Sequence, residues 1–247
     1  KHKPVLVLAH PLGMNMRVWD YLVPDLMVNF SILRYDLPGH GDSVAFPANT
    51  KSLGESQLVD DLLTLCSSLG IDKFHFVGES MGGAMGLHLA IHHPNRLLSV
   101  TPCTCPHKGG AVQWLAEWRD YIAEHGMDSW SKRMMGRRFY PGGLSENAES
   151  WFANTQASSA PRSVLGHGEM LLKVNLSPQL PSITTPIHLI AADNSPFLPL
   201  PVTLEIRDAI PGSEMDVIPN SRHGVVFSHA QQCAESLRGF LDRNSAS

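Results

Sequence analysis

The sequence predicts an α/β protein with a mostly parallel central sheet that is covered by helices on both faces. Segments typical of strands alternate with segments typical of helices over most of the chain. The strand segments are continuous apolar runs such as residues 5–9, as expected for strands buried on both sides. A third observation is a Gly-x-Ser-x-Gly sequence at residues 78–82, which joins an apolar run to a helical pattern.

Each expected element follows from this alternation. Strands are expected at residues 5–9, 31–35, 74–77, 97–101, 187–192 and 214–218. Helices are expected near residues 16–26, 53–69, 81–93 and 225–241. From about residue 107 to 186 the chain shows helical segments without a convincing strand, at 110–125, 128–138, 145–158 and 161–174. This stretch predicts an inserted helical cap rather than a separately linked domain.

The Gly-x-Ser-x-Gly stretch has the residues of a nucleophile elbow. A serine on so tight a turn sits in a strained backbone, so the positions two residues away must lack bulk, and Gly78 and Gly82 meet that need. A helix that starts beneath Ser80 directs its N–H groups and positive dipole end at an oxyanion formed there. The pattern therefore favours Ser80 as a nucleophile.

By these motifs the chain resembles the α/β-hydrolase superfamily, and most closely its small esterases and lactonases of the 3-oxoadipate enol-lactonase type. The resemblance is carried by residues 12–13 with 17–20, by residues 33–43, and by residues 78–83. It implies an α/β-hydrolase core over residues 1–106 and 187–247, with the cap over residues 107–186. It also implies His223, which follows the last expected strand, as general base, and the N–H groups of Leu12 and Met81 as the oxyanion hole.

The third member of the expected catalytic triad is where this chain departs from the family pattern. Aligned on the strand at 187–192, the position of the usual aspartate is taken by Ser195, and the only carboxylate nearby is that of Asp193. Three alternatives stay open. Asp193 serves from a rebuilt loop, or Ser80 and His223 work as a pair oriented by a neutral group such as Ser195 or water, or the site is inactive or repurposed.

The cap is expected to set substrate choice. Its aromatic residues are mostly packing, and Trp114 and Trp118 are the two expected to reach the substrate. A cluster of cations, Lys132, Arg133, Arg137 and Arg138, either binds a substrate carboxylate or forms a solvated helix face; we select Arg133, together with Ser195, as substrate-binding candidates.

Composition indicates a single globular domain with a small cap. Of the 247 residues 43% are hydrophobic and 17% charged, and the net charge of −4 offers no basic face for nucleic acid or an anionic membrane. We expect no metal, because Cys103, Cys105 and His107 lack a common zinc spacing, and no organic cofactor. The four cysteines show no disulfide framework, which favours a cytoplasmic location. A monomer or homodimer is expected.

These features predict a serine hydrolase that cleaves an ester or enol lactone of a small organic substrate. The cations of the cap would allow this substrate to carry a carboxylate. Two alternatives remain. Related folds include carbon–carbon bond hydrolases, isomerases and decarboxylases that act on ring-cleavage keto acids, and some relatives have become ligand receptors.

Overall fold

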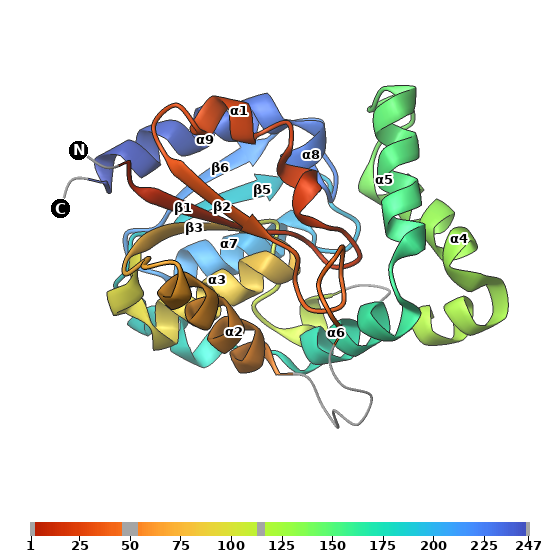
Figure 1. Cartoon of the computed structure of the whole chain (residues 1–247), viewed down its shortest axis with the longest axis horizontal. Helices are drawn as coiled ribbons and strands as arrows, with labels where there is room; N and C mark the ends of the chain where they lie inside the picture. The colour runs from red at the N-terminus through yellow and green to blue at the C-terminus, as the bar shows by residue number, and fades with distance from the viewer. Residues whose placement is uncertain (1–2, 46–53, 113–116, 246–247) are drawn as a thin grey trace.

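The computed structural model describes residues 3–45, 54–112 and 117–245. Its centre is a six-stranded parallel sheet with the strand order β2-β1-β3-β4-β5-β6 (Figure 1). The strands are β1 (Val5–Ala9), β2 (Ser31–Tyr35), β3 (Phe74–Glu79), β4 (Leu97–Cys103), β5 (His188–Ala192) and β6 (Glu214–Ile218). The predicted fold class is confirmed.

Helices cover both faces of the sheet. One face carries α1 (Val23–Leu26), α8 (Val225–Ser228) and α9 (Ala230–Arg243), and the other carries α2 (Glu55–Ser68), α3 (Met81–His92) and α7 (Leu200–Ala209) (Figure 1). In β1, Leu6 and Leu8 pack on the first face while Val7 and Ala9 pack on the second. Because successive side chains of a strand point to opposite faces, a strand covered on both sides reads as a continuous apolar run.

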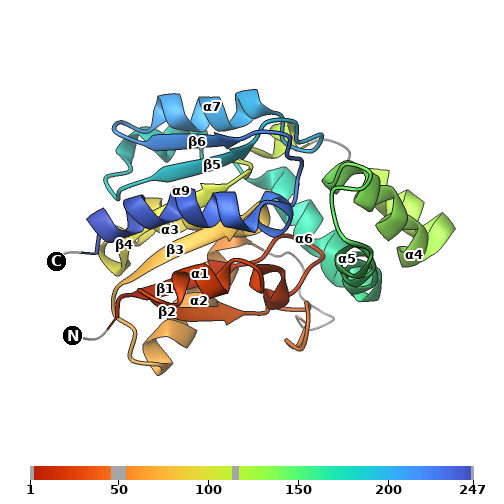
Figure 2. The same ribbon diagram turned by 90° about the horizontal axis from the view of Figure 1, so that it is seen from above.

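The cap lies beyond the carboxyl ends of the strands, at one end of the molecule in Figures 1 and 2. It comprises η3 (Gly109–Ala111), α4 (Trp118–Arg138), α5 (Glu146–Ser158) and α6 (Pro161–Lys173), whereas η5 (Ser177–Ser182), also within the stretch expected to form the cap, packs against the core helices α3 and α7. Trp151 of α5 stacks on Phe227 of α8 at 5.3 Å between ring centroids, and Asn194 donates a 2.7 Å hydrogen bond to the hydroxyl of Tyr140. These contacts hold the cap against the core.

Several helix limits differ from those expected. The segment 16–26 is divided into η1 (Met16–Trp19) and α1, and the segment 225–241 is divided at His229, whose φ of −126° is not helical. The first long cap helix begins at Trp118, later than predicted, and it breaks at Gly126 (φ 75°, ψ 175°). That break is the boundary expected between the segments 110–125 and 128–138, since glycine alone adopts this conformation without strain.

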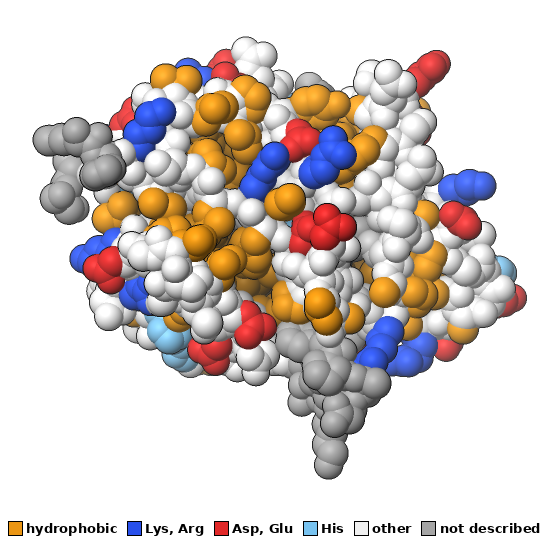
Figure 3. All heavy atoms as spheres, in the orientation of Figure 1, with side chains coloured by type: hydrophobic (Ala, Val, Ile, Leu, Met, Phe, Trp, Pro, Cys, Tyr) orange, Lys and Arg blue, Asp and Glu red, His pale blue; other side chains and the backbone are white. Residues whose placement is uncertain are grey.

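The surface mixes charges of both signs. On the face shown in Figure 3, Lys and Arg side chains are interspersed with Asp and Glu. Among the helices that the structure describes, none is long and apolar enough to cross a bilayer.

Candidate active site

Ser80 stands on a sharp turn between β3 and α3. Its backbone angles, φ 56° and ψ −112°, lie in a strained region for a residue with a side chain. A Cβ on Gly78 would lie 2.2 Å from the carbonyl oxygen of Gly82, and one on Gly82 would lie 2.3 Å from that of Ala9. The turn is therefore possible only with glycine at both positions. The Ser80 side chain makes no capping hydrogen bond to α3 and stays available for chemistry.

Two backbone N–H groups are available near this serine. Met81 is the first residue of α3, so its N–H has no partner within the helix. Leu12 lies in the loop after β1, and its N–H makes no hydrogen bond with the residues described. Leu12 and Ser80 line the same cavity. The arrangement is compatible with the predicted oxyanion hole, and the roles of both donors remain predictions.

Two buried histidines hold the loop that carries Leu12. His10 accepts the Leu37 N–H at its Nε2 (2.9 Å), and its Nδ1 lies 2.9 Å from the Pro11 carbonyl oxygen. His40 accepts the Gly13 N–H at its Nε2 (3.2 Å). In both rings Nε2 must be unprotonated to accept, so both are neutral. Burial lowers the pKa of His10 to about 4 and places that of His40 well below its ordinary value.

Stability should therefore fall in acid. The two folded pKa values lie below the 6.5 of an ordinary histidine, so the unfolded chain takes up protons first as the pH drops below 6.5. Each such ring lowers the free energy of unfolding by about 1.4 kcal/mol per pH unit until its folded pKa is reached. Urea unfolding at pH 7 and pH 5 measures this. His40→Gln should flatten the dependence and exposed His125→Gln should not; equal stability at both pH values contradicts the account.

A narrow cavity lies between the elbow and the cap. Its empty volume is about 380 Å³, including its open mouth. Its lining is mainly apolar and includes three polar side chains, those of Ser80, His223 and Arg138. A ligand in this cavity would meet a hydroxyl, an imidazole and a guanidinium.

Ser195 is the hydrogen-bond partner of His223. The Ser195 Oγ lies 3.2 Å from the Nδ1 of His223 and accepts the N–H of Leu198 at 3.2 Å. Both side chains are buried, with 3% of each residue exposed. Ser195 thus occupies the place beside Nδ1 that a triad carboxylate would take. This contact agrees with the alternative in which a neutral group orients His223, while the expected role of Ser195 in substrate binding stays a prediction.

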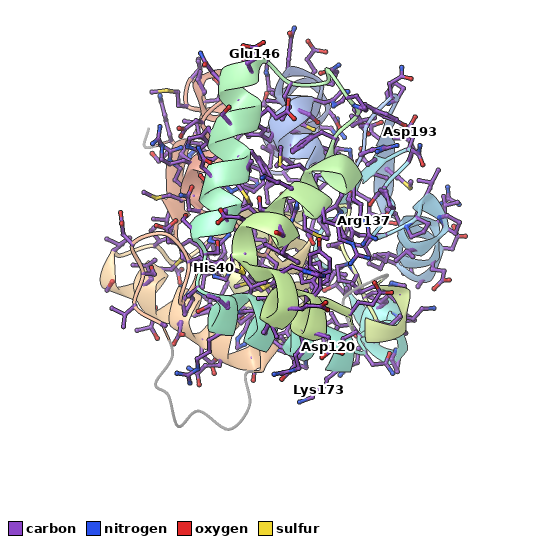
Figure 4. The ribbon with its side chains drawn as sticks, turned by 90° about the vertical axis from the view of Figure 1, so that its right-hand side faces the viewer. His40, Asp120, Arg137, Glu146, Lys173 and Asp193 are labelled. Carbon is purple, nitrogen blue, oxygen red and sulfur yellow. The ribbon has the colours of Figure 1, made fainter. Side chains whose placement is uncertain are left out.

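Asp193 faces another way. Its two carboxylate oxygens accept the N–H groups of Asn220 (2.8 Å) and Ser221 (2.9 Å), which belong to the loop that leads to His223. Asp193 is exposed, and Figure 4 shows it toward the rim of the molecule. The expectation that its carboxylate orients His223 is corrected, because these two backbone bonds hold it to the loop instead.

A serine partner fixes the proton position and the charge of His223 less firmly than a carboxylate would. A carboxylate only accepts, which fixes the proton on Nδ1 and leaves Nε2 free as the base, whereas a hydroxyl donates or accepts. Burial places the pKa of His223 well below its ordinary value, and the positive charge of Arg138 lowers it further. A protonated His223 side chain is therefore poorly stabilised by these surroundings.

Arg138 is the functional candidate that the sequence did not single out from its neighbours. It ends α4, lines the cavity and is 2% exposed. Arg133, selected instead, does not line the cavity: it pairs with Glu117 at 3.0 Å and lies over the Tyr121 ring. The expectation for Arg133 is corrected, since its guanidinium contacts Glu117 and Tyr121 and not the cavity.

The remaining predicted residues differ in where the structure places them. Trp118 lines the cavity and packs edge-on against Trp130, at 5.0 Å between ring centroids, so its part in substrate binding stays a prediction. Trp114 lies outside the described residues. Cys103 and Cys105 are buried, and burial raises the pKa of both thiols, that of Cys105 to about 12. Within the described ranges no group of three or more His, Cys, Asp and Glu side chains is arranged to hold a metal ion.

Known proteins share this architecture. Similar sequences include a pimeloyl-[acyl-carrier protein] methyl ester esterase of Vibrio vulnificus (25% identical, 97% of this chain and 95% of the relative) and 3-oxoadipate enol-lactonase 2 of Acinetobacter baylyi (26%, 92% and 87%). The enol-lactonase structure from Burkholderia xenovorans superposes with a TM-score of 0.90 at 23% identity, over 98% and 92% of the two chains. The family model described as "alpha/beta hydrolase fold" matches residues 4–230. The protein is therefore a member of the alpha/beta hydrolase family.

Proposed function

We propose that the protein is a serine hydrolase that cleaves an ester or enol lactone of a small organic substrate through an acyl-enzyme. The observation that carries this proposal is the strained elbow of Ser80, whose free hydroxyl lines one cavity with the buried imidazole of His223. Residues with a purely structural role rarely adopt such a strained backbone conformation. Similarity to esterases and a lactonase agrees with this reaction class.

The first half of the reaction forms the acyl-enzyme. His223 Nε2 removes the proton of Ser80 Oγ as this oxygen attacks the substrate carbonyl carbon. The carbonyl oxygen becomes a tetrahedral oxyanion, which the N–H groups of Leu12 and Met81 stabilise. His223 then returns the proton to the leaving oxygen, and the bond from the carbonyl carbon to that oxygen breaks. With a lactone, the leaving oxygen remains attached to the acyl chain.

The second half regenerates Ser80. His223 removes a proton from water, the resulting hydroxide attacks the acyl carbon, and Ser80 Oγ leaves with the proton. The cycle consumes one water and requires neither a metal ion nor an organic cofactor.

Ser195 beside His223 favours an activated substrate. In the serine-protease example of this chemistry, neutralising the carboxylate that orients the histidine lowers turnover by about 10⁴, while the oxyanion hole still supplies 10³–10⁴ over water. A good leaving group needs less help from the base. We therefore propose an enol lactone or aryl ester in preference to an alkyl ester. The four buried cysteines are free thiols, which supports the proposal of a reducing, cytoplasmic location.

Active-site labelling tests the proposal. A fluorophosphonate should add to Ser80 and stop hydrolysis of 4-nitrophenyl acetate in the same proportion, because it reacts with an activated serine in an oxyanion hole. Mass spectrometry of the peptide that contains Ser80 locates the adduct. Full hydrolytic activity after complete labelling, or an adduct on another residue, would show that Ser80 is not the nucleophile.

A further inference from the structure

Arg138 is a buried cation that forms no ion pair with the residues that the structure describes. Its Nε donates to Gln156 Oε1 (2.8 Å) and its Nη2 donates to the Leu12 carbonyl oxygen (3.1 Å). Its Nη1 has no hydrogen-bond partner among the residues that the structure describes. Two N–H groups of Nη1 and one of Nη2 therefore remain, and a guanidinium at neutral pH stays charged. Buried charges are ordinarily paired, so this one calls for an anion from outside the chain.

Glu79 compensates the charge of Arg138 only in part. Its Oε1 accepts the Val226 N–H at 3.4 Å, and its Oε2 has no hydrogen-bond partner in the described part of the chain. Burial raises the pKa of Glu79 to about 7, whereas the pKa of Arg138 falls only to about 10. Burial therefore favours the neutral form of Glu79, although the charge of Arg138 opposes this, and Arg138 itself stays charged.

Arg138 lines the same cavity as Ser80 and His223, and the ring of Phe197 contacts both Arg138 and His223. The guanidinium carbon is 5.8 Å from the centre of the Phe197 ring, and that ring is 5.0 Å from the ring of His223. The other described residues that line the cavity are apolar, namely Leu12, Pro106, Val112, Trp118, Leu171 and Leu198. A ligand that fits this cavity has a short apolar body, with a carbonyl at Ser80 and an anionic group at Arg138.

We propose that Arg138 binds a carboxylate of the substrate, so that the enzyme selects esters or lactones that carry a free carboxylate on a short apolar chain. This inference rests on the proposed function and narrows its substrate class. The unused N–H groups of Nη1 and Nη2 suit the two oxygens of a carboxylate. A carboxylate bound there also offsets the charge that Arg138 exerts on His223, which stabilises the imidazolium. The preference should therefore appear in kcat as well as in KM.

Two matched esters test the inference. Mono-4-nitrophenyl adipate carries a free carboxylate, and its methyl ester has nearly the same shape without the charge. The parent protein should hydrolyse the acid with a kcat/KM about 10- to 100-fold higher, the size expected for a hydrogen bond to a charged group. Arg138→Met should abolish this preference. Arg119→Met, which removes an exposed cation of the same helix, should retain it. Rates with Ser80→Ala give the background to subtract.

The possible results distinguish failure of the carboxylate site from failure of the proposed function. Equal hydrolysis of both esters by the parent overturns the carboxylate site and leaves the proposed function standing. An equal loss on both esters in Arg138→Met also overturns it, since Arg138 would then only support the Leu12 carbonyl. If Arg138→Met does not fold, Arg138→Lys decides, because it keeps the charge with fewer donors and should retain part of the preference. Absence of hydrolysis and of labelling at Ser80 contradicts the proposed function itself.

Discussion

Ser80→Ala is expected to lower kcat for 4-nitrophenyl acetate by at least about 10⁴-fold, because no acyl-enzyme forms without the Oγ. The residual rate comes from the oxyanion hole acting on a water attack, which supplies 10³–10⁴ over water in a comparable site. Stopped-flow and steady-state hydrolysis on the same preparation measure the loss and the disappearance of any burst.

The fold should survive this change. Ser80 makes no capping hydrogen bond, and the elbow is closed by its backbone N–H, which donates to the Cys103 carbonyl oxygen at 2.9 Å. The melting temperature of Ser80→Ala should therefore match that of the parent or exceed it. Turnover within tenfold of the parent, in a protein that melts normally, would exclude Ser80 as nucleophile.

Ser195→Asp is expected to raise kcat for simple alkyl esters by about 10²–10³-fold. The new carboxylate lies beside His223 Nδ1, where the serine Oγ now lies at 3.2 Å. The carboxylate fixes the proton on Nδ1 and stabilises the imidazolium. In serine proteases, replacing the charged aspartate by its amide lowers kcat by about 10⁴-fold. Steady-state hydrolysis of an alkyl ester across the pH range measures the gain.

Ser195→Asn is the matched control, since it has the size of aspartate without the charge. It should show no gain and keep the preference for activated esters. If Ser195→Asn gains as much as Ser195→Asp, the effect comes from repacking around Leu198 and not from the charge. No gain in a folded Ser195→Asp would mean that Ser195 does not set the activity of His223.

Much of the site was predictable because it depends on local backbone rules. The elbow needs Gly78 and Gly82 around Ser80, and the strand positions follow from buried apolar runs. The exchange at position 195 was also visible, since aligning the strand of residues 187–192 already places Ser195 where the acid belongs. The direction of Asp193 was not predictable, because it depends on the backbone of residues 220–221, which lie far away in sequence.

Arg138 could not be chosen from the sequence for a related reason. Four cations fall within seven residues of one helix, from Lys132 to Arg138. Which of them is buried depends on how α4 meets the cavity and on the break at Gly126, and neither is set by the local pattern. In the sequence, the lysine and the arginines on the solvent side cannot be distinguished from Arg138, which Gln156 and Leu12 hold inside the protein.

We propose that His223 is oriented by Ser195 and not by a carboxylate. Turnover of Asp193→Asn and Ser195→Ala on one aryl ester tests it most directly. Asp193→Asn should keep kcat within about threefold, because its side chain holds only the loop backbone, whereas Ser195→Ala should lose roughly tenfold or more. A loss of 10³–10⁴ in Asp193→Asn with a neutral Ser195→Ala would contradict the account and restore Asp193 as the triad acid.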